Sequence, residues 1–309
     1  MPKAPASASA WRNPRCVTLR ALLTGVIAIA AGRDGNAQPA QTRPASQPAL
    51  FQPGVQIDWA ARTVIVHSRV VLRRGPLEFF ACLSGKEHES ILRLEAAGVH
   101  IFMALGLVGL TPGHPPIWDE NRQSYSRPAG ELVEIVCQWE VDGRSQSASP
   151  FDFLREIEFA RRPIERPWVF CGSIVLADGS LACDQTGAAL ALVDFPEALL
   201  ALSRGGSSEN SRLWAEANPE SIPPVGTTVL LLLRPAQPRP RRVELDFRGQ
   251  TWLDGKFVSL PDLIDILLLE RQLEPLRTQT ISVRGALRSD VVELQCKLAE
   301  AGLAVSFTE

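Results

Sequence analysis

Several signals that would identify a common class of protein are missing from this chain of 309 residues. Its main apolar run, ALLTGVIAIAAG at 21–32, is far shorter than the ~20 residues that a membrane-spanning helix needs. No basic stripe is interleaved with aromatic residues, and the one dense basic cluster, RPRR at 239–242, is punctuated by proline. These absences give no indication of a nucleic-acid partner or of a transmembrane span in the mature chain.

Motifs for metal binding and catalysis are missing as well. No two cysteines have the close spacing of zinc or iron–sulfur sites, and no cofactor is expected. In GKEHESILRL at 85–94, position 92, four residues after His88, is a leucine, so the zincin pattern fails. There is no GxSxG nucleophile elbow.

The amino terminus has the features of a signal peptide. Three arginines between residues 12 and 20 precede the apolar run, and Gly35 and Ala37 are small residues of the kind that a signal peptidase recognises. We therefore predict cleavage after Ala37 and a periplasmic or otherwise exported mature protein beginning at Gln38. Removal of 1–37 takes away five of 32 basic and one of 34 acidic residues, which leaves a formal net charge of −6.

Proline-rich segments in the remaining chain predict two modules. Residues 38–50 are rich in Pro, Gln, Ala and Ser and are interpreted as a disordered spacer. A first module is expected at 51–235, a proline-rich linker at 236–242, and a second module at 243–309.

The first module is predicted to be mostly antiparallel β with few helices. RTVIVHSRVVL, PLEFFACL and the alternating run ELVEIVCQWEV are typical of strands, as are the segments 168–176, 188–195 and 226–234. HESILRLE also alternates as a strand does, whereas apolar residues recur at helical spacing over 97–108. Short helices are expected from Pro196 and near 208–217.

The second module has a different predicted order of elements, namely strand, short strand or turn, helix, strand, helix, strand. Ser259 is expected to cap its first helix and Asp290 its second, which would end at Gly302. This order predicts a small two-layer α/β sandwich, so that the fold class of the whole chain is expected to be α+β.

Both modules resemble known families. Residues 51–235 resemble the YdjY-domain family through GPLEFFACLSGKEHES, HIFMALGLVGLTPGHPP, WVFCGSIVLADGSLACDQTG, VDFPEALLAL and IPPVGTTVLLLLRP. That resemblance implies an exported protein of undefined activity. Residues 243–309 resemble the periplasmic domain of the ExbD/TolR family through WLDGKFVSLPDLIDIL, ISVRG and LAEAGLAVSF. This second resemblance implies an accessory domain of the biopolymer-transport type; the acidic transmembrane helix of those proteins is replaced here by another folded module.

Three functions remain open for the first module. In a non-enzymatic protein, Glu87, His88, Glu89 and His100 would form a binding surface, because flanking carboxylates are costly to bury. In a metal-binding protein, His88, His100 and His114 would converge, since three imidazoles suit zinc or copper.

In a hydrolase, Cys82 or Ser90 would act as nucleophile beside His88. Of these three functions we favour the first, a non-enzymatic exported protein with no catalytic residue.

The sequence also suggests partners and one covalent link. An envelope protein is the expected partner, and homo-oligomerisation through the C-terminal module is a further hypothesis. Cys171 and Cys183 flank the turn residues Asp178 and Gly179 and are a candidate disulfide in an oxidising compartment. Small buried thiols are the alternative interpretation of the same two cysteines.

Overall fold

The structure is a computed structural model that describes residues 47–119, 124–203, 206, 212–238, 241–273 and 278–308. Ala45–Glu309 form one compact unit. The predicted signal peptide at 1–37 and most of the predicted spacer lie outside the described residues.

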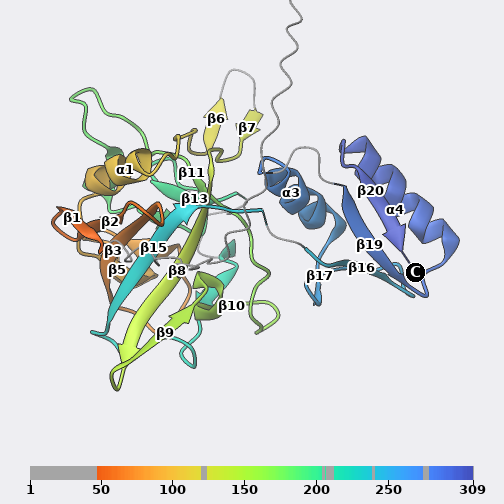
Figure 1. The fold of residues 1–309 in the computed structure, drawn as a ribbon, viewed down its shortest axis with the longest axis horizontal. Helices are drawn as coiled ribbons and strands as arrows, with labels where there is room; N and C mark the ends of the chain where they lie inside the picture. Colours follow the sequence, from red (N-terminus) through yellow and green to blue (C-terminus); the bar gives the residue numbers. More distant parts are fainter. Residues whose placement is uncertain are drawn as a thin grey trace, which may run out of the picture. The chain divides into compact units, whose positions relative to one another are not determined.

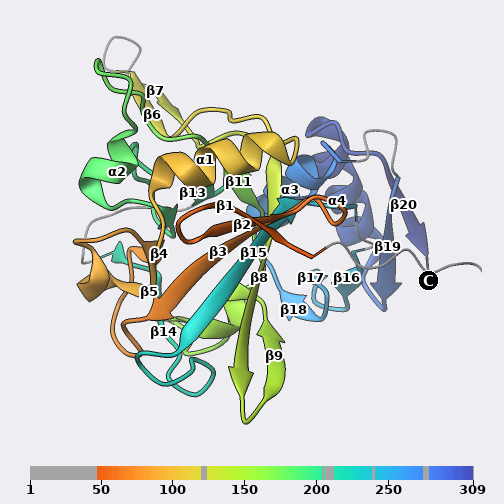
Figure 2. The same ribbon diagram turned by 60° about the vertical axis from the view of Figure 1, so that its left-hand side comes forward.

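An eleven-stranded sheet dominates the first module (Figures 1 and 2). Strand β3 pairs with both β15 and β5, so that eight strands close into a ring in the order β3-β15-β8-β11-β13-β12-β4-β5. Most neighbours are antiparallel, whereas β4–β5 and β12–β13 are parallel. The strands of the ring are β3 (Thr63–Val70), β4 (Phe79–Cys82), β5 (Ser90–Leu94), β8 (Leu132–Val141), β11 (Trp168–Phe170), β12 (Leu190–Ala191), β13 (Leu200–Leu202) and β15 (Thr228–Pro235).

The remaining strands of this module extend or flank the ring. Strands β1 (Ala49–Gln52) and β2 (Val55–Asp58) continue the sheet beyond β3, and β9 (Arg144–Ala148) pairs with β8. Two short antiparallel pairs form separate sheets: β6 (Ile117–Asp119) with β7 (Ser124–Ser126), and β10 (Leu154–Glu156) with β14 (Ala215–Ala217).

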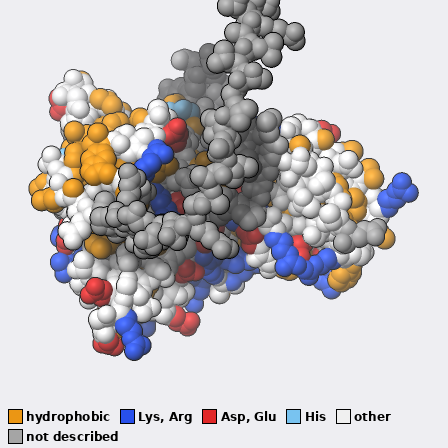
Figure 3. Space-filling view, viewed as in Figure 1, with side chains coloured by type: hydrophobic (Ala, Val, Ile, Leu, Met, Phe, Trp, Pro, Cys, Tyr) orange, Lys and Arg blue, Asp and Glu red, His pale blue; other side chains and the backbone are white. Residues whose placement is uncertain are grey.

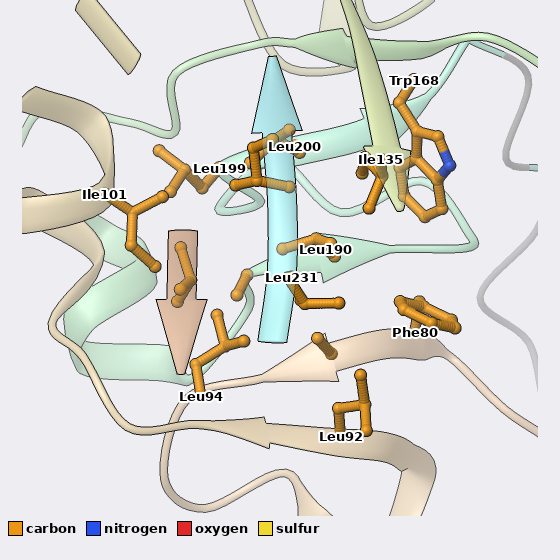
Figure 4. Close-up of a cluster of buried hydrophobic side chains, with 14 of the residues drawn as sticks. Phe80, Leu92, Leu94, Ile101, Ile135, Trp168, Leu190, Leu199, Leu200 and Leu231 are labelled. Carbon is orange, nitrogen blue, oxygen red and sulfur yellow. The ribbon is translucent and has the colours of Figure 1, made fainter. Parts of the chain in front are cut away.

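The inside of the closed sheet is the main core. The predicted alternation of β8 is confirmed, because Val133, Ile135 and Cys137 are buried on one face. Figure 4 shows side chains from β4, β5, β8, β11, β12, β13 and β15 meeting around Leu231 and Leu190. Since period-2 strands place alternate residues on one face, closing the sheet encloses these side chains without a covering layer of helices.

Helices play a minor part in the first module. The predicted helix at 97–108 is confirmed as α1 (Gly98–Leu107). The carboxylate of Asp184 accepts hydrogen bonds from the backbone N–H groups of Gly98 at 2.5 Å and Val99 at 3.0 Å. Asp184 itself belongs to the short helix α2 (Ala182–Thr186). Two 3-10 turns, η1 (Glu87–Glu89) and η2 (Pro150–Phe153), complete the set.

The C-terminal residues form a separate sheet in the order β18-β17-β16-β19-β20. Its elements are β16 (Val243–Asp246), β17 (Thr251–Leu253), β18 (Lys256–Phe257), α3 (Leu260–Glu270), β19 (Gln279–Arg284), α4 (Arg288–Glu300) and β20 (Val305–Thr308). The Ser259 cap is confirmed, since its Oγ accepts from Asp262 N at 3.3 Å. The predicted Asp290 cap is wrong. The cap position of α4 is Leu287, three residues before Asp290, and Asp290 lies in the first turn of the helix.

The predicted α+β fold class, with its two-layer α/β sandwich, is wrong. The described residues are β-rich, and only four α-helices, all short, occur among them. The prediction failed because period-2 patterns reveal strands but not that β3 and β5 pair and close the sheet on itself. With its core enclosed by strands, the first module needs few covering helices.

Two segments also differ locally from the predictions. The strand expected at 168–176 ends at Phe170, because Gly172 and Ser173 adopt positive φ angles of 89° and 63°. No helix forms from Pro196, where a buried irregular segment instead packs Phe195 and Ala198 on Phe79. The helix expected near 208–217 lies partly outside the described residues, and its described end is strand β14. No described helix has both the length and the apolar character needed to cross a bilayer.

Candidate functional site

The stretch GKEHES forms a turn between two strands of the closed sheet. Glu87, His88 and Glu89 make up η1, and the predicted strand begins only at Ser90. The side chain of His88 is 74% exposed, and its Nε2 lies 3.7 Å from Glu89 Oε2. His88 is therefore a surface residue, whereas the carboxylate of Glu89 turns toward the protein.

The carboxyl group of Glu89, in this turn, lies close to that of the buried Glu78. Glu78, which is 9% exposed, shares a side-chain hydrogen bond with Glu89. Burial, followed by the proximity of Glu89, raises the pKa of Glu78 to about 7. Lys86 Nζ lies 2.7 Å from Glu89 Oε1 and above the rings of Phe79 and Phe195. Sequence reasoning missed Glu78, although a lone carboxyl inside the apolar run PLEFFACL was a signal for it.

The two candidate nucleophiles, Cys82 and Ser90, are both buried. Cys82 is fully buried, and burial raises the pKa of its thiol to about 11. Ser90, also fully buried, donates its hydroxyl hydrogen to Lys86 O at 2.7 Å. Because the thiolate is the reactive form of cysteine, a thiol with a raised pKa is a poor nucleophile at neutral pH.

The three histidines of the metal hypothesis occupy different elements. His88 lies in η1, His100 in α1, and His114 in a loop, where its Nδ1 is 2.9 Å from Pro115 O. No group of three or more His, Cys, Asp or Glu side chains suited to a metal ion occurs among the residues that the structure describes.

A groove of about 490 Å³ contains one of the predicted binding residues. His100 lines it, together with Arg93, Glu95 and Asp184. Glu87 does not line it; the Oε1 atom of Glu87 lies 3.9 Å from Nη1 of Arg93, which does. Of the four residues predicted to form a binding surface, His100 alone lines this groove, whereas Glu89 turns toward Lys86 and Glu78.

The outer face of α1 is apolar. Ile101, Ala104 and Leu105 are buried against the sheet, yet Met103 is 49% and Leu107 is 51% exposed. Val99, one turn before Met103, is 37% exposed, so these three side chains form a stripe at i, i+4 and i+8. Figure 3 shows hydrophobic side chains gathered over α1. We call Val99, Met103 and Leu107 the α1 stripe.

Sequence reasoning missed the α1 stripe because the segment is apolar on all sides. HIFMALGLVGL has no polar face to mark an exposed side, which is the pattern of a fully covered helix. That excess of apolar residues on a helix with only one buried face was the available signal.

The disulfide candidates Cys171 and Cys183 are both buried free thiols in the structure. Cys171 Sγ lies 3.2 Å from Ala198 O, whereas Cys183 Sγ lies beside Gly98 at the start of α1. Burial raises the pKa of Cys171 to about 12 and that of Cys183 to about 11. Both are small buried thiols in this structure, and the disulfide between them stays a prediction.

Comparison with known proteins gives one match. The family described as YdjY domain matches residues 55–234, more than half of the chain. The matched range includes α1 and all of the closed sheet except Pro235, and it ends before the C-terminal sheet. No curated protein and no solved structure matches.

Proposed function

From the premise that the chain belongs to the YdjY domain family, we propose that it is an exported, non-enzymatic cell-envelope protein. Its first module binds a protein partner through the α1 stripe and the adjoining groove. The observation that carries this proposal is the α1 stripe itself, three apolar side chains exposed along one helix.

The surroundings of the α1 stripe support a protein partner. Interfaces combine an apolar centre with a polar rim, and contiguous exposed apolar surface is uncommon on monomers. Here the groove supplies the rim with His100, Arg93 and Asp184. A partner would cover the stripe and place its own polar groups in the groove.

The chemistry of the turn supports a role without catalysis. The Cys82 thiol is buried and the Ser90 hydroxyl is committed to a backbone carbonyl. Reaction with a thiol or serine probe at either residue would favour the hydrolase alternative, and stoichiometric metal in the purified mature chain would favour the metal-binding alternative. We expect neither.

Export and envelope docking complete the proposal. Export rests on the signal-peptide pattern at 1–37, and amino-terminal sequencing from the native host should find Gln38 first. The docking role of residues 243–309 rests on the sequence resemblance to ExbD/TolR periplasmic domains. An intact Met1 in a cytoplasmic fraction would remove the exported role.

A charge placed on the α1 stripe tests partner binding. Met103→Glu puts a carboxylate at the centre of the proposed interface, in place of a side chain that is 49% exposed. Val141→Glu, at the 45% exposed end of β8, is the matched control. A partner retained from envelope extract by the wild type and the control should be lost by Met103→Glu; equal retention by both variants would contradict the proposal.

A further inference from the structure

A second cavity lies away from the α1 face. It measures about 230 Å³ and shares no lining residue with the α1 groove. Its floor comes from residues 132–135 of β8 and from Trp168 at the start of β11, and its walls come from 165–167 and 236–238. Glu270, the last residue of α3, and Leu273 also line it, as do Ser149, Phe151 and Arg241.

Trp168, one of the residues that line the cavity, carries a buried hydrogen-bond donor without an acceptor among the described residues. Trp168 is 3% exposed, and its indole Nε1 has no hydrogen-bond partner among the described residues. Figure 4 shows this nitrogen on the side of the ring that faces away from the aliphatic core cluster. A buried unpaired N–H costs ~1–3 kcal/mol, so an acceptor supplied by a ligand would be favoured there.

Each carboxylate that lines the cavity pairs with an arginine, and the guanidinium of Arg166, which also lines it, lies 5.1 Å from the ring centre of Trp214. Glu134 accepts two hydrogen bonds from Arg234, at 3.0 and 3.1 Å, and Glu270 pairs with Arg241 at 2.6 Å. Glu165 likewise pairs with Arg162 at 2.6 Å. The lining carboxylates would repel an anionic ligand, and the lining guanidinium groups would repel a cationic one. The lining therefore favours an uncharged ligand.

We propose that this cavity binds one residue of an extended, uncharged peptide segment. The peptide carbonyl accepts the Trp168 indole N–H, because an amide oxygen is a strong neutral acceptor. The apolar side chain next to that carbonyl packs on Ile135 and Phe151, which also line the cavity. The cavity volume of 230 Å³ is below the ~300–1,000 Å³ of pockets for drug-sized ligands, which suits a single residue.

Indole N–H resonances of the full mature chain test this proposal. N-acetyl-leucinamide supplies one amide carbonyl beside one apolar side chain, and Trp168→Phe identifies the Trp168 signal by its loss. Titration should shift that signal saturably, with the millimolar affinity of a fragment. The indoles of Trp214 and Trp252 are internal controls, since they already donate to Leu192 O and Asp246 Oδ2, both at 3.0 Å.

Two variants test separately the hydrogen bond from Trp168 and the access of a ligand to the cavity. Trp168→Phe should weaken binding by about 2- to 10-fold in a ligand-detected titration, the effect of one lost hydrogen bond. Gln237→Trp places a bulky ring at the exposed rim and should block binding while leaving the core intact. The second variant keeps the proposal testable if the first fails to fold.

Three results would overturn the proposal. These are no saturable shift of the Trp168 signal, an equal shift of all the indole signals, or binding that neither variant weakens. An equal response to N-acetylglucosamine would overturn the assignment to a peptide. Because the cavity and the α1 stripe are separate, Met103→Glu should leave this titration unchanged whatever its effect on partner capture.

Discussion

At the scale of single residues, Glu78 makes stability depend on pH. Its folded-state pKa of about 7 lies above the ordinary value of 4.5, so its contribution is fully present below pH 4.5 and is lost as pH rises through 7. We expect Glu78→Gln to raise the free energy of unfolding at pH 8 by about 1 kcal/mol, after allowance for solvent screening, and to change it little at pH 4.5.

Urea unfolding at the two pH values measures this effect. Glu158→Gln, at an exposed position, is the control and should leave the pH dependence unchanged. If Glu78→Gln is no more stable than the wild type at pH 8, the carboxyl pair with Glu89 does not carry the pH dependence.

Cysteine reactivity is a second prediction at this scale. Among the described cysteines, Cys296 is exposed and the other four are buried. Burial also raises the pKa values of all four buried thiols, Cys82, Cys137, Cys171 and Cys183. We therefore expect a thiol reagent to modify one cysteine rapidly in the native mature chain and all five after denaturation. Rapid labelling that persists in Cys296→Ser would show that a buried thiol is accessible.

At the scale of elements, two glycines of α1 should respond in opposite ways to alanine. A Cβ at Gly98 would lie 2.6 Å from Cys183 Sγ, whereas one at Gly106 meets nothing within 4 Å. Gly98→Ala should therefore lower the free energy of unfolding by ~1–3 kcal/mol through overpacking. Gly106→Ala should raise it by ~0.5–1 kcal/mol, because alanine favours the helix.

Thermal and urea unfolding of the two variants compare these effects within one helix. If Gly98→Ala proved as stable as Gly106→Ala, the close packing of α1 on α2 would be wrong. Circular dichroism should show unchanged secondary structure in both variants.

The same scale explains what the sequence could and could not predict. Strands β3, β8 and β15 and helix α1 were predictable, because each is one uninterrupted periodic segment. The pairing of β3 with β5 was not, since partner choice between distant strands leaves no local signal. The site shows the same division: exposure of His88 was predictable from its flanking carboxylates, whereas the burial of Glu78 and the α1 stripe depend on neighbours distant in sequence.

At the scale of the whole molecule, the second core predicts an independent fragment. Val243, Leu253, Leu263 and Leu298 belong to a hydrophobic cluster separate from that of the closed sheet. The Arg241 side chain is 6% exposed and pairs with Asp254 and Glu270, so the fragment has to begin no later than 241.

We therefore expect residues 241–309 to fold alone, although at roughly 70 residues with marginal stability. Dispersed amide resonances and a cooperative urea transition would support this expectation. A chain beginning at Val243 should be less stable because it lacks Arg241. A fragment that stays unfolded would show that the two cores depend on each other.

The most direct test of the proposed function is photocrosslinking in the native host. A photoreactive residue at Met103, on the α1 stripe, is compared with one at Arg144, exposed at the β8–β9 turn. The binding role predicts a discrete crosslinked product from position 103 and none from position 144. No product from position 103, or the same products from both positions, would contradict a partner-binding face on α1.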